Sequence, residues 1–221
     1  MTLVPTSFPP QRRNFLARLG LGAAVLLAGD ATRADALDTE SAGDPWLGPL
    51  SGKHKMYFDA TSVNGGFPLA YAMNWLNTAP GAYNAKESEF SAVIGARHVS
   101  AVLGLNDAMW AKYNIGAFSN VTDPQTKAMA KRNIYYNSLP GDMPWAGAAI
   151  EKLQGRGAHM VACGAALGAL SGMLGAPVGV AADVAKADFM ANLLPGVVVV
   201  PSGVFALGYA QEKGLAYCYA G

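Results

Sequence analysis

The sequence predicts a three-layer α/β/α domain, in which helices cover both faces of a mostly parallel sheet of about five strands. Short apolar runs without strict alternation recur along the chain, and each is followed by a segment with helical spacing. Strands of this kind are buried on both faces, as in a parallel sheet covered by helices. Glycine is also abundant, at 26 of 221 residues, which suits a fold with many tight turns.

Five runs are predicted to be strands, and four consecutive valines make the fourth the clearest. In chain order they are Lys55–Ala60, Ser91–Ala96, His159–Ala162, Val197–Val200 and Leu215–Tyr219. Apolar residues at helical spacing predict the intervening helices. These are Phe67–Leu76, Val99–Tyr113, Trp145–Leu153, Gly164–Leu174, Asp183–Leu194 and Phe205–Lys213.

The composition excludes several classes of protein. Hydrophobic residues make up 52% of the chain and charged residues 14%, so a disordered protein is excluded. A net charge of +1 gives no reason to expect a nucleic-acid partner. Two cysteines and three widely spaced histidines predict no metal centre. No phosphate-cradling glycine loop supports a flavin or nucleotide enzyme, so we expect no cofactor.

The first 36 residues resemble a twin-arginine export signal. Arg12 and Arg13 precede an apolar run over residues 19–29, and Ala34-Asp35-Ala36 is a cleavage pattern of the small-x-small type. We expect cleavage near Ala36 and a periplasmic or otherwise exported product; an uncleaved anchor is the alternative. Residues 37–51 are interpreted as a linker and 52–221 as a single domain.

The segment from 158 to 182 carries no charged side chain, and Gly164, Gly168 and Gly172 recur at the spacing of a membrane-helix contact face. Pro177 interrupts it before one helix could cross the ~30 Å hydrocarbon layer. We therefore expect no stable membrane span, and interpret the segment as a buried strand and a helix packed closely on the sheet or on another subunit.

Ligands of open parallel sheets bind beyond the carboxyl ends of the strands. Asp59, Arg97, His98, Cys163 and Ser202 all lie at such ends. A thiolate at a strand-to-helix junction is stabilised by free backbone N–H groups and serves as a nucleophile or sulfur carrier. A buried structural cysteine is the competing interpretation.

The other candidates also have structural interpretations. His98 could donate a proton or be a structural histidine, and Asp59 could belong to the site or cap a turn. Cys218 lies in an apolar alternation, which favours core packing. A Cys163–Cys218 disulfide is the alternative in an oxidising compartment. Residues 114–144 lack regular periodicity, and form either a lid or a subunit-contact arm.

Several segments resemble the DsrE-like sulfur-relay family, over roughly Gly52 to Gly221. They are MVACGAALGAL, LPGVVVVPSGVFAL, AQEKGLAYCYAG and, as in an exported subgroup with twin-arginine signals, RHVSAVLGLNDAMWAKYNIG. The resemblance implies an α/β/α fold, homo-oligomers and a cysteine, here Cys163, that passes persulfide sulfur to a partner. Characterised members are cytoplasmic and work with dedicated partner subunits, whereas this chain carries an export signal.

These observations combine into one hypothesis, in which an exported DsrE-like domain holds sulfur on Cys163. The partners would be a small sulfur-containing molecule or an acceptor protein. His98 is the second catalytic candidate. The ligand-binding candidates are Asp59, Arg97, Asn106, Lys127, Arg132 and Ser202. The alternative is a non-catalytic binding or assembly subunit with a structural cysteine.

Overall fold

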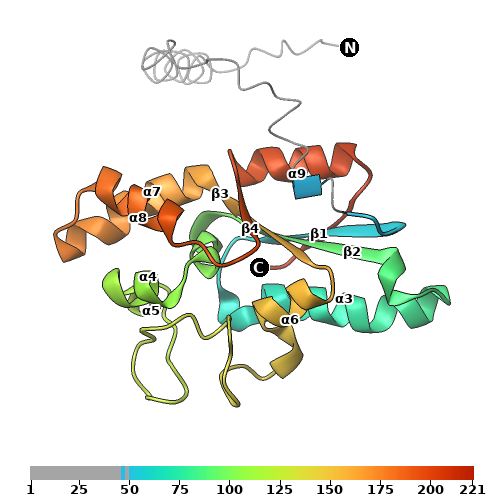
Figure 1. The fold of residues 1–221 in the computed structure, drawn as a ribbon, viewed down its shortest axis with the longest axis horizontal. Helices are drawn as coiled ribbons and strands as arrows, with labels where there is room; N and C mark the ends of the chain where they lie inside the picture. The colour runs from blue at the N-terminus through green and yellow to red at the C-terminus, as the bar shows by residue number, and fades with distance from the viewer. Residues whose placement is uncertain (1–45, 48–49) are drawn as a thin grey trace, which may run out of the picture. The chain divides into compact units, whose positions relative to one another are not determined.

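The fold is taken from a computed structural model that describes residues 46–47 and 50–221 (Figure 1). The predicted export signal over residues 1–36 lies outside the described residues, and so does most of the predicted linker. Trp46 and Leu50, from that linker segment, are buried against Tyr57 and α9 residues. At least these two side chains therefore contribute to the domain core.

A five-stranded sheet, parallel throughout, confirms the predicted fold class. From edge to edge its strands are β4 (Val197–Val200), β3 (His159–Cys163), β2 (Phe90–Ala96), β1 (His54–Ala60) and β5 (Ala216–Tyr219). β2 is buried along its whole length. Each strand lies within one residue of its predicted bounds at either end.

Helices form the outer layers (Figure 1). On one face of the sheet lie α3 (Phe67–Tyr83) and α6 (Ile150–Gly155), and on the other lies α9 (Gly203–Glu212). Beside β3 and β4, α7 (Gly164–Gly175) and α8 (Ala182–Ala191) pack against each other, next to the short α4 (Asp107–Lys112) and α5 (Ile115–Phe118). One apolar core lies on the α3 face and a smaller one under α9.

Two predicted helices are divided in the structure. The segment predicted as one helix over 99–113 forms a 3-10 helix, His98–Gly104, and then α4. Leu105 is extended and pairs with Leu193, so the chain leaves the helical path before Asn106 caps α4. The helix predicted over Trp145–Leu153 is divided at Ala149, whose backbone is extended between a 3-10 turn and α6.

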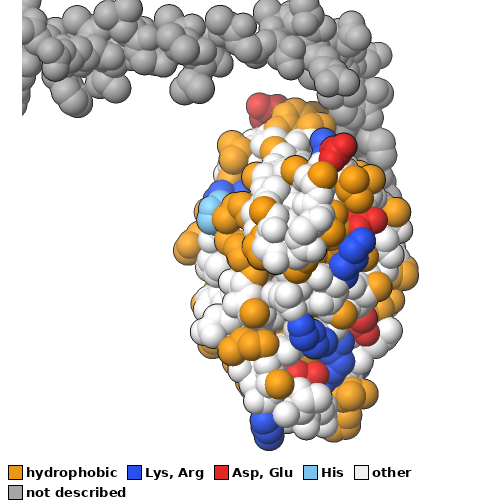
Figure 2. Space-filling view, turned by 90° about the vertical axis from the view of Figure 1, so that its left-hand side faces the viewer, with side chains coloured by type: hydrophobic (Ala, Val, Ile, Leu, Met, Phe, Trp, Pro, Cys, Tyr) orange, Lys and Arg blue, Asp and Glu red, His pale blue; other side chains and the backbone are white. Residues whose placement is uncertain are grey.

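Large apolar side chains are exposed on the outer surface of α7 and α8, where Asp183 and Lys186 are exposed as well. Met173, Val184 and Met190 are exposed there, and Figure 2 faces this end of the molecule, where apolar side chains outnumber charged ones. Within residues 46–47 and 50–221, no one helix has both the length and the hydropathy to cross a membrane. The consecutive helices 164–178 and 182–191 pass that test together, with a bend of 115° between them.

Candidate functional site

The carboxyl edge of the sheet, on the face covered by α9, brings together several predicted site residues. Tyr57 and Asp59 are two residues apart on β1 and therefore point to the same face. The register pairs Asp59 with Gly95 on β2. A Cβ atom on Gly95 would lie 1.9 Å from the Tyr57 hydroxyl oxygen, so the glycine makes room for this tyrosine.

Asp59 is fully buried and bonded to two neighbours. Arg97 donates from Nε to Oδ1 at 2.7 Å and from Nη2 to Oδ2 at 2.9 Å, and the Tyr217 hydroxyl lies 3.0 Å from Oδ2. The hydrogen bond to Asp59 raises the pKa of Arg97, which stays protonated. Gly203, at the start of α9, has no room for a side chain, since its Cβ would lie 2.4 Å from Arg97 Cβ. The ion pair is thus enclosed by α9.

Cys163 ends β3 and is the N-cap residue of α7. Its side chain is nearly buried, at 6% exposure, and Sγ accepts a hydrogen bond from Ala166 N at 3.2 Å. A thiolate or persulfide anion is stabilised by such a donor at the first turn of a helix. The geometry suits a negatively charged sulfur, as a sulfur carrier requires.

The hydroxyl of Tyr57 is buried and has no hydrogen-bond partner within the described part of the chain. Burial raises the pKa of Tyr57, and the negative charges of Asp59 and Cys163 raise it further, against an opposite effect of Arg97. Tyr57 therefore remains protonated at neutral pH. It is a neutral donor on the α9 face of the sheet, and burying an unpaired hydroxyl costs about 1–3 kcal/mol.

Ser202 is the residue before α9 and lies at the same edge of the sheet. It is half-buried, and its side chain makes no capping hydrogen bond. Next to it, Pro201 O accepts from Ala165 N in the first turn of α7, at 3.1 Å. The starts of α7 and α9 are therefore neighbours. Asp59, Arg97, Cys163 and Ser202 all lie at this edge.

The remaining predicted residues lie apart from this cluster. His98 is exposed with a backbone φ of 56°, and no hydrogen bond or ion pair of its side chain occurs among residues 46–47 and 50–221. Asn106 accepts from Met109 N at 3.2 Å as the cap of α4, and donates to Asn192 Oδ1 at 3.1 Å. The polar atoms of Asn106 are thus used in local structure.

The segment 114–144 comprises α5 and a long loop, and its two cationic candidates differ. Lys127 is exposed. Arg132 is bonded to both Asp123 and Asp142 at 2.6–2.8 Å, and the two carboxylates are buried. Arg132 anchors the loop, and its guanidinium is already paired with two anions.

Cys163 and Cys218 are too far apart for a disulfide within one chain. Cys218 pairs with Phe58 and faces the α3 core, whereas Cys163 follows Val161 on the α9 face. Three strand spacings, or about 14 Å, separate β3 from β5, and a disulfide needs Cα atoms within ~7 Å. Both thiols are free. No group of three potential metal ligands occurs among the described residues.

Comparisons with known proteins add nothing to this site: no family model, curated protein or solved structure matches the chain. Sequence reasoning missed Tyr57 and Tyr217. Tyr57 could have been found, because it lies two residues before Asp59 on the same strand and must share its face. Tyr217 could not, because its position depends on β5 pairing with β1, the first strand of the chain.

Proposed function

We propose that this protein is an exported sulfur carrier that holds a sulfur atom on Cys163 and passes it to an acceptor thiol, as the resemblance to DsrE-like proteins implies. One observation carries the proposal. The Cys163 sulfur is the N-cap atom of α7 and is bonded to Ala166 N, and on the same face of the sheet a buried Tyr57 hydroxyl lacks a partner among the described residues.

The chemistry is a transfer of sulfane sulfur without net oxidation. The Cys163 thiolate attacks the outer sulfur of a donor persulfide, so that a new S–S bond forms to Cys163. The S–S bond of the donor breaks, and its electron pair leaves with the donor thiolate. An acceptor thiolate then attacks the outer sulfur on Cys163 and regenerates the Cys163 thiolate.

Two side chains support this cycle. Tyr57 would donate its unpaired hydroxyl to the outer sulfur once that sulfur is bound to Cys163, a role that suits a buried donor better than the exposed His98. Arg97 holds Asp59 in a neutral pair, so the carboxylate does not repel the incoming anion as strongly as a free charge would.

The test uses the two cysteines as a matched pair. The protein is incubated with a low-molecular-weight persulfide, and its intact mass is measured with and without reductant. We expect a reductant-labile gain of one sulfur atom in the wild type and in Cys218→Ser, but not in Cys163→Ser. Sulfur on Cys218, or equal loading of all three proteins, would contradict the proposal.

A second candidate is a non-catalytic binding or assembly subunit, favoured by the near-complete burial of Cys163. It requires that thiol reagents reach Cys163 only when the protein unfolds. Labelling that is as slow as global unfolding, with no sulfur loading, would support this subunit over the carrier.

Export and self-association are proposed on separate grounds. The sequence of residues 1–36 supports twin-arginine export, and the N-terminal mass of periplasmic protein tests for cleavage after Ala36. The apolar surface of α7 and α8 supports a homo-oligomer. Sedimentation equilibrium tests it: a monomer at micromolar concentration would contradict it.

A further inference from the structure

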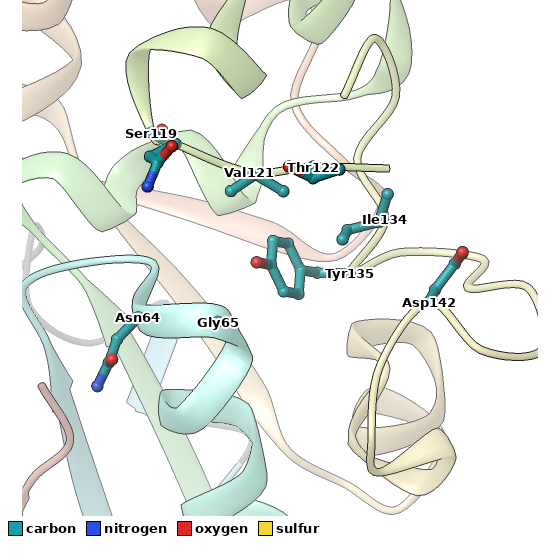
Figure 3. Close-up of a pocket in the computed structure, with 9 residues that line it drawn as sticks. Asn64, Gly65, Ser119, Val121, Thr122, Ile134, Tyr135 and Asp142 are labelled. Atoms are coloured by element: carbon teal, nitrogen blue, oxygen red, sulfur yellow. The ribbon is translucent and has the colours of Figure 1, made fainter. Parts of the chain in front are cut away.

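A concave site lies on the α3 side of the molecule and involves none of the residues around Cys163. It is a cavity of about 380 Å³ between the turn after β1 and the loop after α5. Asn64 and Gly65 line one side, and residues 119–122 line the other (Figure 3). Its volume falls within the range of ~300–1,000 Å³ usual for ligand pockets.

Tyr135 projects into this cavity between the two sides (Figure 3). Its ring is packed on Gly66, where a Cβ would lie 3.0 Å from Tyr135 Cε1, and the side chain is only 2% exposed. Burial raises the pKa of Tyr135 to about 12, so the hydroxyl is protonated. Its ring and Ile134 provide an apolar surface next to that hydroxyl.

Two hydroxyl groups of the lining, one sealed and one accessible, have no hydrogen-bond partner among the described residues. The Ser119 oxygen is buried without a hydrogen bond within the described residues, and no hydrogen bond of the Tyr135 hydroxyl occurs in the same part of the chain. Buried polar groups are normally satisfied. The Ser119 oxygen is sealed from solvent, whereas the Tyr135 hydroxyl is not among the sealed atoms and is available to a ligand. The amide of Asn64 and the hydroxyl of Thr122 lie at the exposed rim of the cavity.

The charge around the cavity favours an uncharged ligand. Asp142 is the sole charged residue among the nine described residues that line it, and both its oxygens accept hydrogen bonds from Arg132. Arg132 is shared with Asp123, so this group of three carries a net charge of −1. An anion in the cavity would be repelled, and no unpaired cation lines it.

We propose that this cavity binds a small uncharged molecule rich in hydroxyl groups, of the size and chemistry of a monosaccharide or cyclic polyol. Hydroxyl groups of the ligand would bond to Tyr135, Thr122 and Asn64, and its C–H face would lie on the Tyr135 ring. The proposal is independent of sulfur transfer, since the Cys163 site lies on the opposite face of the sheet.

The test adds glucose, galactose or myo-inositol to the full chain and follows binding by saturation-transfer NMR and amide shifts. Glucuronate serves as the anionic counterpart. We expect neutral probes to bind with millimolar Kd and to shift amides at Gly65 and Asn120. Glucuronate should bind at least about tenfold more weakly than glucose, because of the net negative charge nearby.

Two conservative variants locate the binding. Tyr135→Phe and Thr122→Val each remove one accessible hydroxyl and should weaken binding about three- to tenfold. Tyr83→Phe, which removes a hydroxyl from a tyrosine 62% exposed on α3, is the matched control and should have no effect. Failure of all neutral probes at tens of millimolar, unchanged affinity in Tyr135→Phe and Thr122→Val, or tighter binding of glucuronate would each overturn the proposal.

Discussion

The two faces of the sheet handle buried charge in different ways. On the α9 face, the carboxylate of Asp59 is paired with the guanidinium of Arg97. Asp59 lies in β1 and Arg97 directly follows β2, so the sheet fixes the backbone of both residues. On the α3 face, Arg132 bonds to two carboxylates within a loop that has no regular structure of its own. The strands of the sheet position Asp59 and Arg97, whereas the bonds of Arg132 to the two carboxylates themselves hold the loop in its conformation.

The same contrast applies to two tyrosines. Tyr57 is sealed under α9 with its hydroxyl unpaired, and Tyr135 presents its hydroxyl to a cavity. A sealed donor without a partner lowers the stability of the fold, and an internal acceptor such as an anionic sulfur on Cys163 would offset that loss. An unpaired donor in a cavity wall needs a ligand from outside. The comparison therefore separates a site for chemistry from a site for recognition.

The largest expected effect is on the α9 face. Trp46→Ala should lower the free energy of unfolding by about 3–5 kcal/mol, because a fully buried indole is replaced by a cavity. Trp145→Ala, which removes a half-buried indole packed on Phe67, should cost about half as much. Urea denaturation measures both. Equal costs would mean that the segment around Trp46 adds nothing specific to this face.

Arg97→Ala should cost about 3 kcal/mol, since it leaves the buried Asp59 carboxylate with only the Tyr217 hydroxyl. The guanidinium is 28% exposed, which keeps the effect at the lower end for buried pairs. The control is Arg156→Ala: its partner Glu87 is 48% exposed, and the loss should be below about 1 kcal/mol. If the two variants lost similar amounts of unfolding free energy, the Asp59–Arg97 pair would be no stronger than an exposed ion pair.

Arg132→Gln should cost about 2 kcal/mol at pH 7, and its signature is the pH dependence. Hydrogen bonds from Arg132 lower the pKa of Asp123 below its ordinary value of 3.8. For Asp142, burial is the largest effect and raises the pKa, but hydrogen bonds from Arg132, Leu139 and Gln125 together lower it further than burial raises it. Groups with a lowered pKa stabilise the fold above their ordinary pKa and lose that contribution as pH falls through the folded value.

Urea midpoints between pH 7 and pH 2.5 should therefore fall steeply below about pH 4 in the wild type. The same limb should be shallower in Arg132→Gln, because the two carboxylates have lost the guanidinium that lowers their pKa. Limited proteolysis should cut Arg132→Gln within residues 119–145 before the sheet unfolds. Parallel acid limbs in both proteins would show that the three charges are not coupled.

The α9 face was the more predictable of the two. Strands of consecutive apolar residues predicted the sheet, and the rule for strand ends then selected Asp59, Arg97, Cys163 and Ser202. That these residues lie at one edge follows from the chain order alone. The enclosure of Tyr57 could not be predicted, because it requires both the register of β1 against Gly95 and the position of α9.

The α3 face was less predictable because its loop is ordered by contacts distant in sequence. Periodicity detects repeats within a segment, and the loop has none, so nothing in it indicates that Tyr135 is buried. From the sequence alone Arg132 is expected to be an exposed cation, whereas in the fold it is paired with Asp123 and Asp142. The prediction of one undivided helix over 99–113 failed for a similar reason: the helical spacing continues across the break that the Leu105–Leu193 pairing imposes.

The smallest expected effect on stability is also the sharpest test of the comparison. Tyr57→Phe removes a sealed hydroxyl that has no partner among the described residues, so the variant should be up to about 1 kcal/mol more stable than the wild type. It should nevertheless load sulfur on Cys163 more slowly, since the anionic sulfur loses its donor. Tyr135→Phe should load sulfur at the wild-type rate and change stability by less than about 0.5 kcal/mol, because that hydroxyl faces the cavity. Urea denaturation and timed intact-mass measurements on the two variants give both quantities. A Tyr57→Phe protein that is less stable than the wild type would mean that its hydroxyl is bonded after all, and the distinction between a sealed and an open tyrosine would fail.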